Sequence, residues 1–246
     1  MVSRHAPGDV PYVTAAQMVI VDRIAVERYR IGLVQMMENA GRALACLTRE
    51  RFLGGDPRDK RVVVLAGSGG NGGGVLIAAR HLHNWGACVE VVLARAARTM
   101  KSVPRRQLAI LRCMGVTVRS RSAPGALERP DLVLDGLVGY NLSGAPSGTA
   151  AHLIRWANGS GAPILALDVP SGVDATTGVA FDPAIHAAAT LTLALPKTGL
   201  RAACAANNVG DLYLADIGVP PTVYRRAEIG LDIGFVFARG ELLRLR

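Results

Sequence analysis

The stretch from Arg61 to Trp85, RVVVLAGSGGNGGGVLIAARHLHNW, decides the fold. Its first part, Arg61–Ala66, is mostly β-branched and apolar, which predicts a buried strand. Its last part, Gly74–Trp85, has the length and apolar content of a helix. A glycine-rich loop joins the two. A strand, a loop and a helix in this order predict one unit of an α/β sheet.

The loop Ala66-Gly-Ser-Gly-Gly-Asn-Gly-Gly-Gly74 is suited to an anionic ligand. Glycines let the backbone approach a ligand closely, and free amides at the start of the following helix favour a phosphate. The loop does not match a Walker motif, since no Lys-Ser/Thr follows. It also lacks a full Gly-x-Gly-x-x-Gly pattern, since the next strand runs into Arg95 rather than an acidic residue. A tight turn without a ligand is the alternative.

Further strands and helices are predicted on both sides of this unit. Amphipathic helices are expected from Thr14 to about Arg30 and over Leu33–Phe52. Strands are expected at Cys88–Ala94, Val116–Ser120, Leu132–Val138 and Ile164–Leu167, helices at Lys101–Met114 and Ser147–Ser160, and later apolar runs at Ala189–Leu195, Asp211–Ala215 and Gly234–Phe237. Strands that are apolar on both faces and separated by helices predict a doubly wound α/β sandwich with a mostly parallel sheet. Because no linker-like break appears, we expect one domain over residues 1–246.

Composition narrows the function classes. The 246 residues carry a net charge of +9, with 25 of the 28 basic residues being Arg, and aromatic residues make up 4%. Rings are too few for a base-stacking surface, so we expect no nucleic-acid partner. The N-terminus lacks the apolar core of a signal peptide, which favours a cytoplasmic protein with no membrane association. The four widely spaced cysteines are expected to be free, buried thiols.

Two aspartates are expected where strands end. Asp135 lies in Leu132-Val-Leu-Asp135-Gly, and Asp168 in Ile164-Leu-Ala-Leu-Asp168-Val-Pro-Ser171-Gly. In an open parallel sheet, ligands bind beyond the carboxyl ends of the strands. Two carboxylates there, near an anion-binding loop, could hold a cation and perform acid–base chemistry. The alternative is that each Asp caps the turn that follows it.

A further strand end, Leu195-Pro-Lys197-Thr-Gly, carries one of only three lysines. Lys197 either reaches a ligand phosphate or is an ordinary exposed lysine on a turn. His81 and His83 are two apart in a predicted helix and point to different faces, so they form no ligand pair. No Gly-x-Ser-x-Gly elbow lies at a strand-to-helix turn, which argues against a serine hydrolase.

Motifs in a fixed order along most of the chain point to a family. They are Thr14-Ala-Ala-Gln-Met-Val-Ile-Val-Asp22, Met37-Glu-Asn-Ala-Gly41, Asp135-Gly-Leu-Val-Gly139, Asp168-Val-Pro-Ser-Gly-Val-Asp174, Pro196-Lys-Thr-Gly199 and Ala215-Asp-Ile-Gly218-Val-Pro220. Together they resemble the NAD(P)H-hydrate epimerase family, also known as the apolipoprotein A-I binding protein or YjeF N-terminal family. The resemblance implies a Rossmann-like three-layer α/β/α sandwich, usually a homodimer. It also implies an isomerase that interconverts the R and S forms of hydrated NADH or NADPH at carbon 6 of the nicotinamide ring.

The resemblance also implies a set of site residues. A potassium ion would be bound by Asn71, Asp135 and Ser171. The dinucleotide substrate would contact Gly70, Asn71, Gly72, Gly73, Gly74, Gly139, Tyr140, Asn141, Leu142, Ser143, Gly144, Ala145 and Asp168. Asp168 would be the catalytic acid–base group, because it is the ionisable side chain that the resemblance places beside the hydrated ring.

The glycine-rich loop departs from the family. Where relatives have Asn-Asn-Gly-Gly-Asp, this chain has Gly70-Asn71-Gly72-Gly73-Gly74, and so lacks the first Asn and the Asp. Two polar side chains are therefore missing from the ligand-facing loop. Three hypotheses follow: an active epimerase, a catalytically idle relative that binds a nucleotide-like ligand or acts as a dimeric interaction module, and an enzyme adapted to another small molecule.

Overall fold

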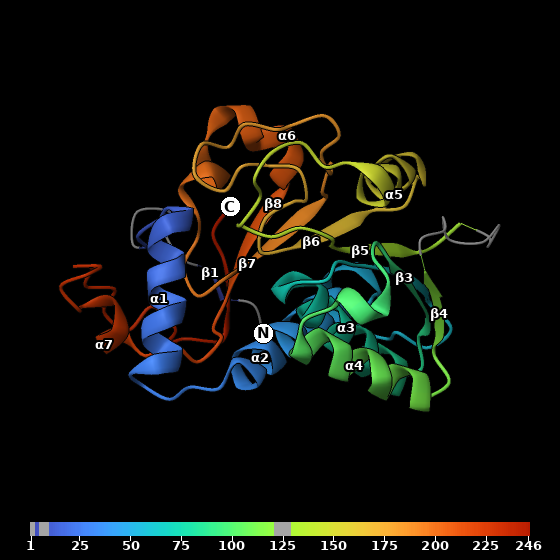
Figure 1. Ribbon diagram of the computed structural model, residues 1–246, viewed down its shortest axis with the longest axis horizontal. Helices are drawn as coiled ribbons and strands as arrows, with labels where there is room; N and C mark the ends of the chain where they lie inside the picture. The colour runs from blue at the N-terminus through green and yellow to red at the C-terminus, as the bar shows by residue number, and fades with distance from the viewer. Residues whose placement is uncertain (1–2, 5–9, 121–128) are drawn as a thin grey trace.

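One sheet organises the computed structural model, which describes residues 3–4, 10–120 and 129–246 (Figure 1). Within these residues the sheet has nine strands in the order β1-β9-β8-β7-β6-β5-β2-β3-β4. The strands are β1 (Ser3–Arg4), β2 (Arg61–Ala66), β3 (Cys88–Leu93), β4 (Thr117–Ser120), β5 (Leu132–Gly136), β6 (Ile164–Leu167), β7 (Ala189–Leu193), β8 (Asp211–Ala215) and β9 (Leu242–Arg244). All neighbours are parallel except β8 and β9. The predicted mostly parallel sheet is confirmed.

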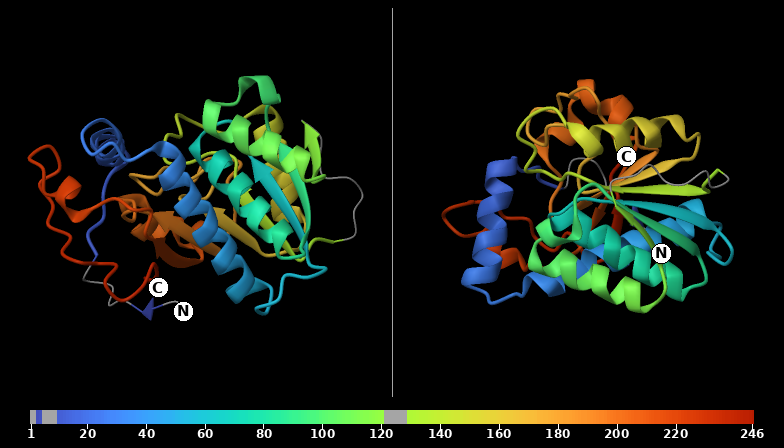
Figure 2. Two further views of the ribbon diagram at one scale, coloured as in Figure 1. Left: turned by 90° about the horizontal axis from the view of Figure 1, so that it is seen from below. Right: turned by 45° about the vertical axis from the view of Figure 1, so that its right-hand side comes forward.

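Helices cover both faces of the sheet, which gives the expected three layers (Figure 2). They are α1 (Ala15–Glu27), α2 (Leu33–Leu47), α3 (Gly70–Asn84), α4 (Ser102–Cys113), α5 (Gly148–Gly159), α6 (Ala206–Val209) and α7 (Pro221–Tyr224). The helices α2, α3 and α4 pack on one face and α5 on the other. The helices α1 and α7 share a further apolar cluster with β8 and β9.

The central strands are buried on both faces because successive side chains point to opposite sides. In β2, Val62 and Val64 face the cluster of α2, α3 and α4, whereas Val63 and Leu65 face the cluster of α5. All four side chains are buried. This two-sided burial is the reason why the strand is a continuous apolar run rather than an alternating one.

The strand register aligns the carboxyl ends of the central strands. Ala66 lies opposite both Leu93 and Gly136, and Leu167 lies opposite Leu191. The ends of β3, β2, β5, β6 and β7 therefore form one edge of the sheet. The loops that follow these strands are brought together there.

Several predicted boundaries are wrong. The helix expected from Gly74 begins at Gly70, where the Gly73 amide already donates to the Gly69 carbonyl over 3.1 Å. Glycine has a low helix propensity, so the pattern concealed this first turn. The helical stretch expected over Leu33–Phe52 has both of its predicted ends, and only its last turn, Thr48–Phe52, is π-helical.

Two strands stop earlier than predicted. The strand β5 ends at Gly136 because the Leu137 amide turns to the Asp135 carboxylate, 3.2 Å away. The strand β7 ends at Leu193 because Ala194 adopts a left-handed φ of 62°. Both turns lie at the edge that carries the aspartates.

The apolar run Gly234–Phe237 forms turns, and the late strand is β9 instead. The Asp232 carboxylate accepts from the Gly234 amide over 3.0 Å, and Gly234 has a φ of 55°. This local side-chain bond closes a turn and prevents extension. Val236 is buried against the cluster of α1 and α7, whereas Phe235 is 81% exposed.

The cysteines are free but not buried. Cys88, Cys113 and Cys204 are exposed, and Cys46 is half-buried. The expectation of buried thiols was therefore wrong. Cys88 is the first residue of β3 and Cys113 the last residue of α4, so both lie where elements emerge from the core.

Candidate active site

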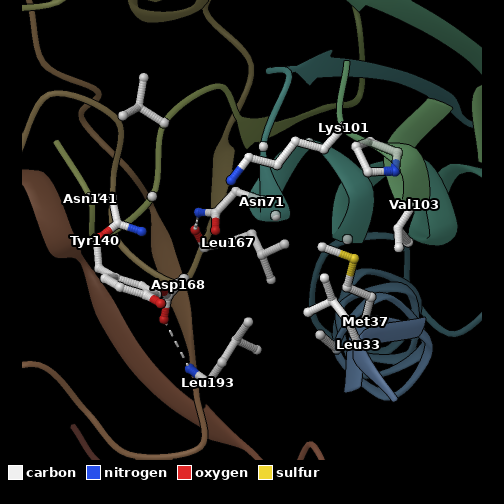
Figure 3. A pocket seen from close by; sticks show the side chains of 18 of the residues that line it. Leu33, Met37, Asn71, Lys101, Val103, Tyr140, Asn141, Leu167, Asp168 and Leu193 are labelled. Carbon is white, nitrogen blue, oxygen red and sulfur yellow. Dashed lines mark hydrogen bonds between the residues drawn. The ribbon is translucent and has the colours of Figure 1, made fainter. Parts of the chain in front are cut away.

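A cavity of about 540 Å³ opens along the aligned strand ends. Its wall comes from the loops after β2, β3, β5, β6 and β7 and from α1, α2 and α4. Figure 3 shows the side chains of Tyr140, Asn141 and Asp168 on one side of this space and those of Leu33, Met37 and Val103 on the other. One end of the cavity is therefore polar and the opposite wall is apolar, which suits a ligand with both characters.

The glycine-rich loop is glycine-rich because the backbone is crowded there. A Cβ on Gly67 would lie 1.9 Å from the Leu137 carbonyl oxygen, and one on Gly72 would lie 2.0 Å from the Gly67 carbonyl oxygen. Neither backbone atom can move as a flexible side chain would. The helix α3 begins in this loop with no side-chain cap, so its first amides are available to an anion.

Asp135 is held inside the sheet edge by Ser171. The Ser171 hydroxyl donates to one carboxylate oxygen of Asp135 over 2.7 Å, and the Ser171 amide donates to the other over 2.8 Å. Burial raises the pKa of Asp135 to about 6, although the hydrogen bonds from Ser171 and the Leu137 amide oppose the shift. Among the described residues no cationic side chain pairs with this carboxylate.

Asn71 reaches the same edge from the first turn of α3. Its side-chain amide nitrogen donates to the Leu167 carbonyl over 2.7 Å, and a Cβ on Gly139 would lie 2.5 Å from its Oδ1. Asn71 therefore rests directly on Gly139, just beyond β5. The three predicted cation ligands thus lie near the same edge of the sheet. Asn71 lines the cavity, whereas Asp135 and Ser171 lie behind its wall.

Asp168 and Lys197 form a buried ion pair at the ends of β6 and β7. The Lys197 ammonium donates to the Asp168 carboxylate and, over 3.0 Å, to the Leu193 carbonyl. The Lys197 side chain is 1% exposed and that of Asp168 is 2% exposed. Asp168 has a left-handed φ of 69°, an unusual conformation of the kind found where a side chain must be aimed. Lys197 is thus neither an exposed lysine nor free on a turn.

A second pair, Asp22 and Tyr140, lines the same end of the cavity. The Tyr140 hydroxyl donates to Asp22, and the Lys197 ammonium lies 5.7 Å from the centre of the Tyr140 ring. Burial raises the pKa of Asp22, only partly offset by the Tyr140 hydrogen bond and the charge of Lys197. Burial and the neighbouring Asp22 charge raise the pKa of Tyr140 above its ordinary value, so the phenol stays protonated. Four ionisable side chains thus gather around one space.

The predicted substrate contacts divide into two groups. Those that line the cavity are Gly70, Asn71, Gly72, Gly74, Gly139, Tyr140, Asn141 and Asp168. Those that lie outside its wall are Gly73, Leu142, Ser143, Gly144 and Ala145. Gly73 faces Met37 instead, whose sulfur would lie 3.1 Å from an added Cβ. The loop after β5 turns away from the cavity beyond Asn141.

Reasoning from the sequence missed Asp22, Arg95 and Lys101 as cavity residues. Asp22 is separated from Tyr140 by 118 positions, and no local pattern joins them. Its one signal was its place at the end of the opening motif. Arg95 had drawn notice only because it follows the strand β3.

The change at Gly74 has a structural explanation. A Cβ on Gly74 would lie 2.5 Å from Cδ2 of Leu167, so this buried leucine would have to shift to admit the Asp that the family resemblance implies here. Gly70 is less crowded, since an added Cβ would lie 3.4 Å from the Met37 methyl carbon. Nothing in the structure explains the missing polar side chain at Gly70.

Restoring the acidic residue with Gly74→Asp is expected to lower the free energy of unfolding by about 1–3 kcal/mol, because the side chain overpacks Leu167. Urea denaturation measures the change. Gly70→Asn serves as the matched control and should cost less than half as much. Equal losses in the two variants would contradict the explanation.

Two features are absent from the part of the chain that the structure describes. No helix in that part of the chain is long and apolar enough to cross a membrane. No group of three or more His, Cys, Asp or Glu side chains there is arranged to hold a metal ion. This second absence concerns His, Cys, Asp and Glu only. It does not bear on Asn71, Asp135 and Ser171, because two of these three residues are of other types.

Comparisons with known proteins agree with the motifs. The family described as YjeF-related protein N-terminus matches residues 33–199. An NAD(P)H-hydrate epimerase of Dehalogenimonas lykanthroporepellens is 46% identical over 95% of this chain and 92% of its own length. The bifunctional NAD(P)H-hydrate repair enzyme Nnr of Salinibacter ruber is 37% identical over 88% of this chain, which spans 42% of that longer protein.

A solved structure supports the fold independently. The crystal structure of yeast ynu0, YNL200c, superposes with a TM-score of 0.79 and covers 96% of this chain and 100% of its own, at 23% identity. At that identity the likeness establishes the three-layer arrangement alone. The matched family model and the identity to curated relatives establish that the chain belongs to the YjeF-related N-terminal family.

Proposed function

We propose that this protein is an NAD(P)H-hydrate epimerase, an isomerase that interconverts the R and S forms of hydrated NADH and NADPH. The observation that carries the proposal is the buried pair of Asp168 and Lys197 at the polar end of the cavity, in a chain 46% identical to a relative with that name. Buried ionisable groups at the end of a cleft are typical of catalytic sites. The alternative of an idle binding module is not favoured, because the relative that matches 95% of this chain is named for the epimerase activity.

The chemistry requires proton transfer at one carbon. Inversion at carbon 6 needs the hydroxyl group to leave as water and water to return from the opposite face of the ring. The departing oxygen takes up a proton, and the returning water gives one back, so the enzyme ends in its starting state. A carboxyl group performs both transfers when it is held at the reacting atom. We assign this role to Asp168.

The neighbours of Asp168 fit that role. Asp168 starts the reaction as the protonated carboxyl, and once it has given its proton to the departing oxygen, the Lys197 ammonium balances the charge of the carboxylate that remains. Tyr140 stays protonated and is a hydrogen-bond donor on the same side of the cavity. The predicted substrate contacts Gly70, Asn71, Gly72, Gly74, Gly139 and Asn141 complete the wall and are proposed to hold the rest of the dinucleotide.

We propose a monovalent cation, potassium, beside Asp135. The proposed ligands are oxygen atoms: the carboxylate of Asp135 and the hydroxyl of Ser171, which are hydrogen-bonded to each other, and the side-chain oxygen of Asn71, which rests on Gly139. Oxygen ligands suit hard cations, and a buried carboxylate with no cationic partner among the described residues has a charge left to neutralise. When bound, the ion would supply positive charge next to the substrate. The chemistry of these three side chains therefore fits a monovalent cation.

The raised pKa of Asp135 predicts a pH effect on stability. Without a bound cation, the folded protein keeps the Asp135 proton up to a pH of about 6, whereas the unfolded chain loses it near 3.8. The free energy of unfolding should therefore fall as the pH rises from about 4 to about 6, by about 3 kcal/mol. Potassium should offset the fall, because it binds the ionised carboxylate.

Urea denaturation at several pH values, in potassium chloride and in tetramethylammonium chloride of equal ionic strength, measures both effects. The Asp135→Asn variant is the control, and the difference between the two proteins isolates this one group. Identical pH profiles for the wild type and the variant would refute the assignment, as would equal profiles in the two salts.

The direct test of the function uses the separated S and R hydrates. Purified protein should interconvert them faster than buffer, with chiral chromatography reporting both forms over time. A wild-type rate equal to that of buffer would refute the epimerase assignment.

Three further expectations remain proposals. We propose a cytoplasmic homodimer with a single domain over residues 1–246. Exposed apolar side chains lie on α1 and at the start of α2, namely Val19, Val26, Leu33 and Val34, and these support the dimer. No nucleic-acid partner is proposed.

A further inference from the structure

A basic segment of the sequence begins beside the cavity. Between Glu90 and Glu128 the sequence contains eight Lys and Arg residues and no Asp or Glu. This segment runs from β3 through α4 to β4, on the side of the sheet remote from Asp168 and Lys197. The start of this basic segment, at the end of β3 and the start of α4, adjoins the proposed substrate site.

Two of these basic residues, Arg95 and Lys101, line the cavity itself. Both side chains are exposed, and neither has a carboxylate partner among the described residues. The Lys101 amide donates to the Ser68 carbonyl over 3.2 Å, which ties the segment to the glycine-rich loop. Figure 3 shows the Lys101 side chain reaching across the cavity toward Asn71. Two cations with no carboxylate partner in the described part of the chain thus line the space toward which α3 opens.

The strand order fixes the spatial order of the cavity residues along the edge of the sheet. Beginning at β3, the edge presents Arg95, then the first turn of α3 after β2, then Tyr140 after β5, then Asp168 and Lys197 after β6 and β7. A dinucleotide is itself a linear series of adenosine, diphosphate, ribose and nicotinamide. With the nicotinamide at Asp168 and the diphosphate at α3, the adenosine ribose falls at the end of β3.

The end of β3 is the position at which dinucleotide-binding sheets read the ribose 2′ group. An acidic residue there binds a 2′-hydroxyl, whereas a nearby Arg accommodates a 2′-phosphate. In this chain the order β4-β3-β2-β5-β6-β7 corresponds to the strand order 3-2-1-4-5-6 of such sheets. Arg95 follows the second strand of that arrangement by two residues. Its planar guanidinium matches a phosphate with two parallel hydrogen bonds.

We propose that this enzyme prefers the hydrate of NADPH to the hydrate of NADH, with Arg95 binding the 2′-phosphate and Lys101 binding the diphosphate. The inference rests on the proposed function and specifies its substrate class. Arg95 and Lys101 have different roles in this proposal. Only Arg95 binds the 2′-phosphate, which NADPH hydrate has and NADH hydrate lacks. Lys101 meets a group that both substrates share.

The test compares kcat/KM for the two hydrates in the wild type and in Arg95→Ser, Lys101→Ala and Arg98→Ser. The wild type should favour NADPH hydrate by about tenfold or more, and Arg95→Ser should remove most of that preference through KM. Lys101→Ala should lower kcat/KM for both substrates by similar factors. Arg98 is exposed in the same basic segment but does not line the cavity, so Arg98→Ser controls for general charge.

The kcat/KM values for the two hydrates either support or overturn the proposed preference for NADPH hydrate. Equal kcat/KM values for the two hydrates in the wild type would overturn it while leaving the epimerase assignment intact. Equal losses for both hydrates in Arg95→Ser would overturn the task given to Arg95. If no turnover occurs, calorimetric titration with NADP⁺ and NAD⁺ still tests the preference, and equal affinities would refute it. Tighter binding of NADP⁺ that Arg95→Ser abolishes would support it.

Discussion

Replacing Asp168 with Asn is expected to slow the interconversion of the two hydrates by about 10²–10⁴-fold, the range that a positioned acid–base group contributes. Asn keeps the shape of the side chain and, like Asp, tolerates the left-handed backbone found at this position, where φ is 69°. It cannot exchange a proton as a carboxyl group does. Rates measured from each pure hydrate, with KM and kcat determined separately, should place the loss in kcat.

The control addresses the partner of Asp168. In Asp168→Asn the buried Lys197 loses its counter-charge, so a loss of activity could reflect damage to the fold. The double variant Asp168→Asn with Lys197→Met removes both charges and should regain thermal stability without regaining activity. A variant Asp168→Asn that is folded and as active as the wild type would contradict the proposed role of the carboxylate.

Replacing Lys197 alone with Met is expected to lower the free energy of unfolding by about 3–5 kcal/mol. The reason is that Asp168, 2% exposed, would remain buried without the ammonium that balances it. The hydrogen bond of 3.0 Å to the Leu193 carbonyl would also be lost. Urea denaturation measures the effect, and Met matches the length and flexibility of the lysine stem.

Lys60→Met is the matched control, because Lys60 is exposed and pairs with no carboxylate among the described residues. Its effect should stay within about 0.5 kcal/mol, as for most surface substitutions. Equal effects at the two lysines would contradict the buried pair. In Lys197→Met the hydrate reaction should also slow, since the charge next to Asp168 changes.

The sequence was sufficient to predict the layers and the edge of the sheet where ligands bind. The apolar run Arg61–Ala66, the glycine-rich loop and the helix after it needed no information beyond local pattern. Asp135 and Asp168 were predicted at strand ends, and the strand register places both there. These features follow from short-range order, which the sequence shows directly.

Other features depended on packing between distant segments. The sequence left undecided whether Lys197 is exposed or buried. Its burial depends on Asp168, which lies 29 positions away in the chain, directly after β6. The start of α3 was missed because four of its first five residues are glycines, whose place in a helix depends on close packing against Met37, Gly67 and Leu167. The pairing of Asp22 with Tyr140 required the docking of α1 against the sheet edge.

The crowded glycines of the α3 loop have a consequence for how the cavity responds to acid and base. At Gly67 and Gly72 there is room for backbone alone, so an anion at this point meets main-chain amides, which carry no titratable proton. The opposite end holds Asp22, Tyr140, Asp168 and Lys197, all of which do. A change in pH therefore affects the two halves of the cavity differently. The main-chain amides that would bind the diphosphate keep their protons, whereas the reacting end is lined by ionisable side chains.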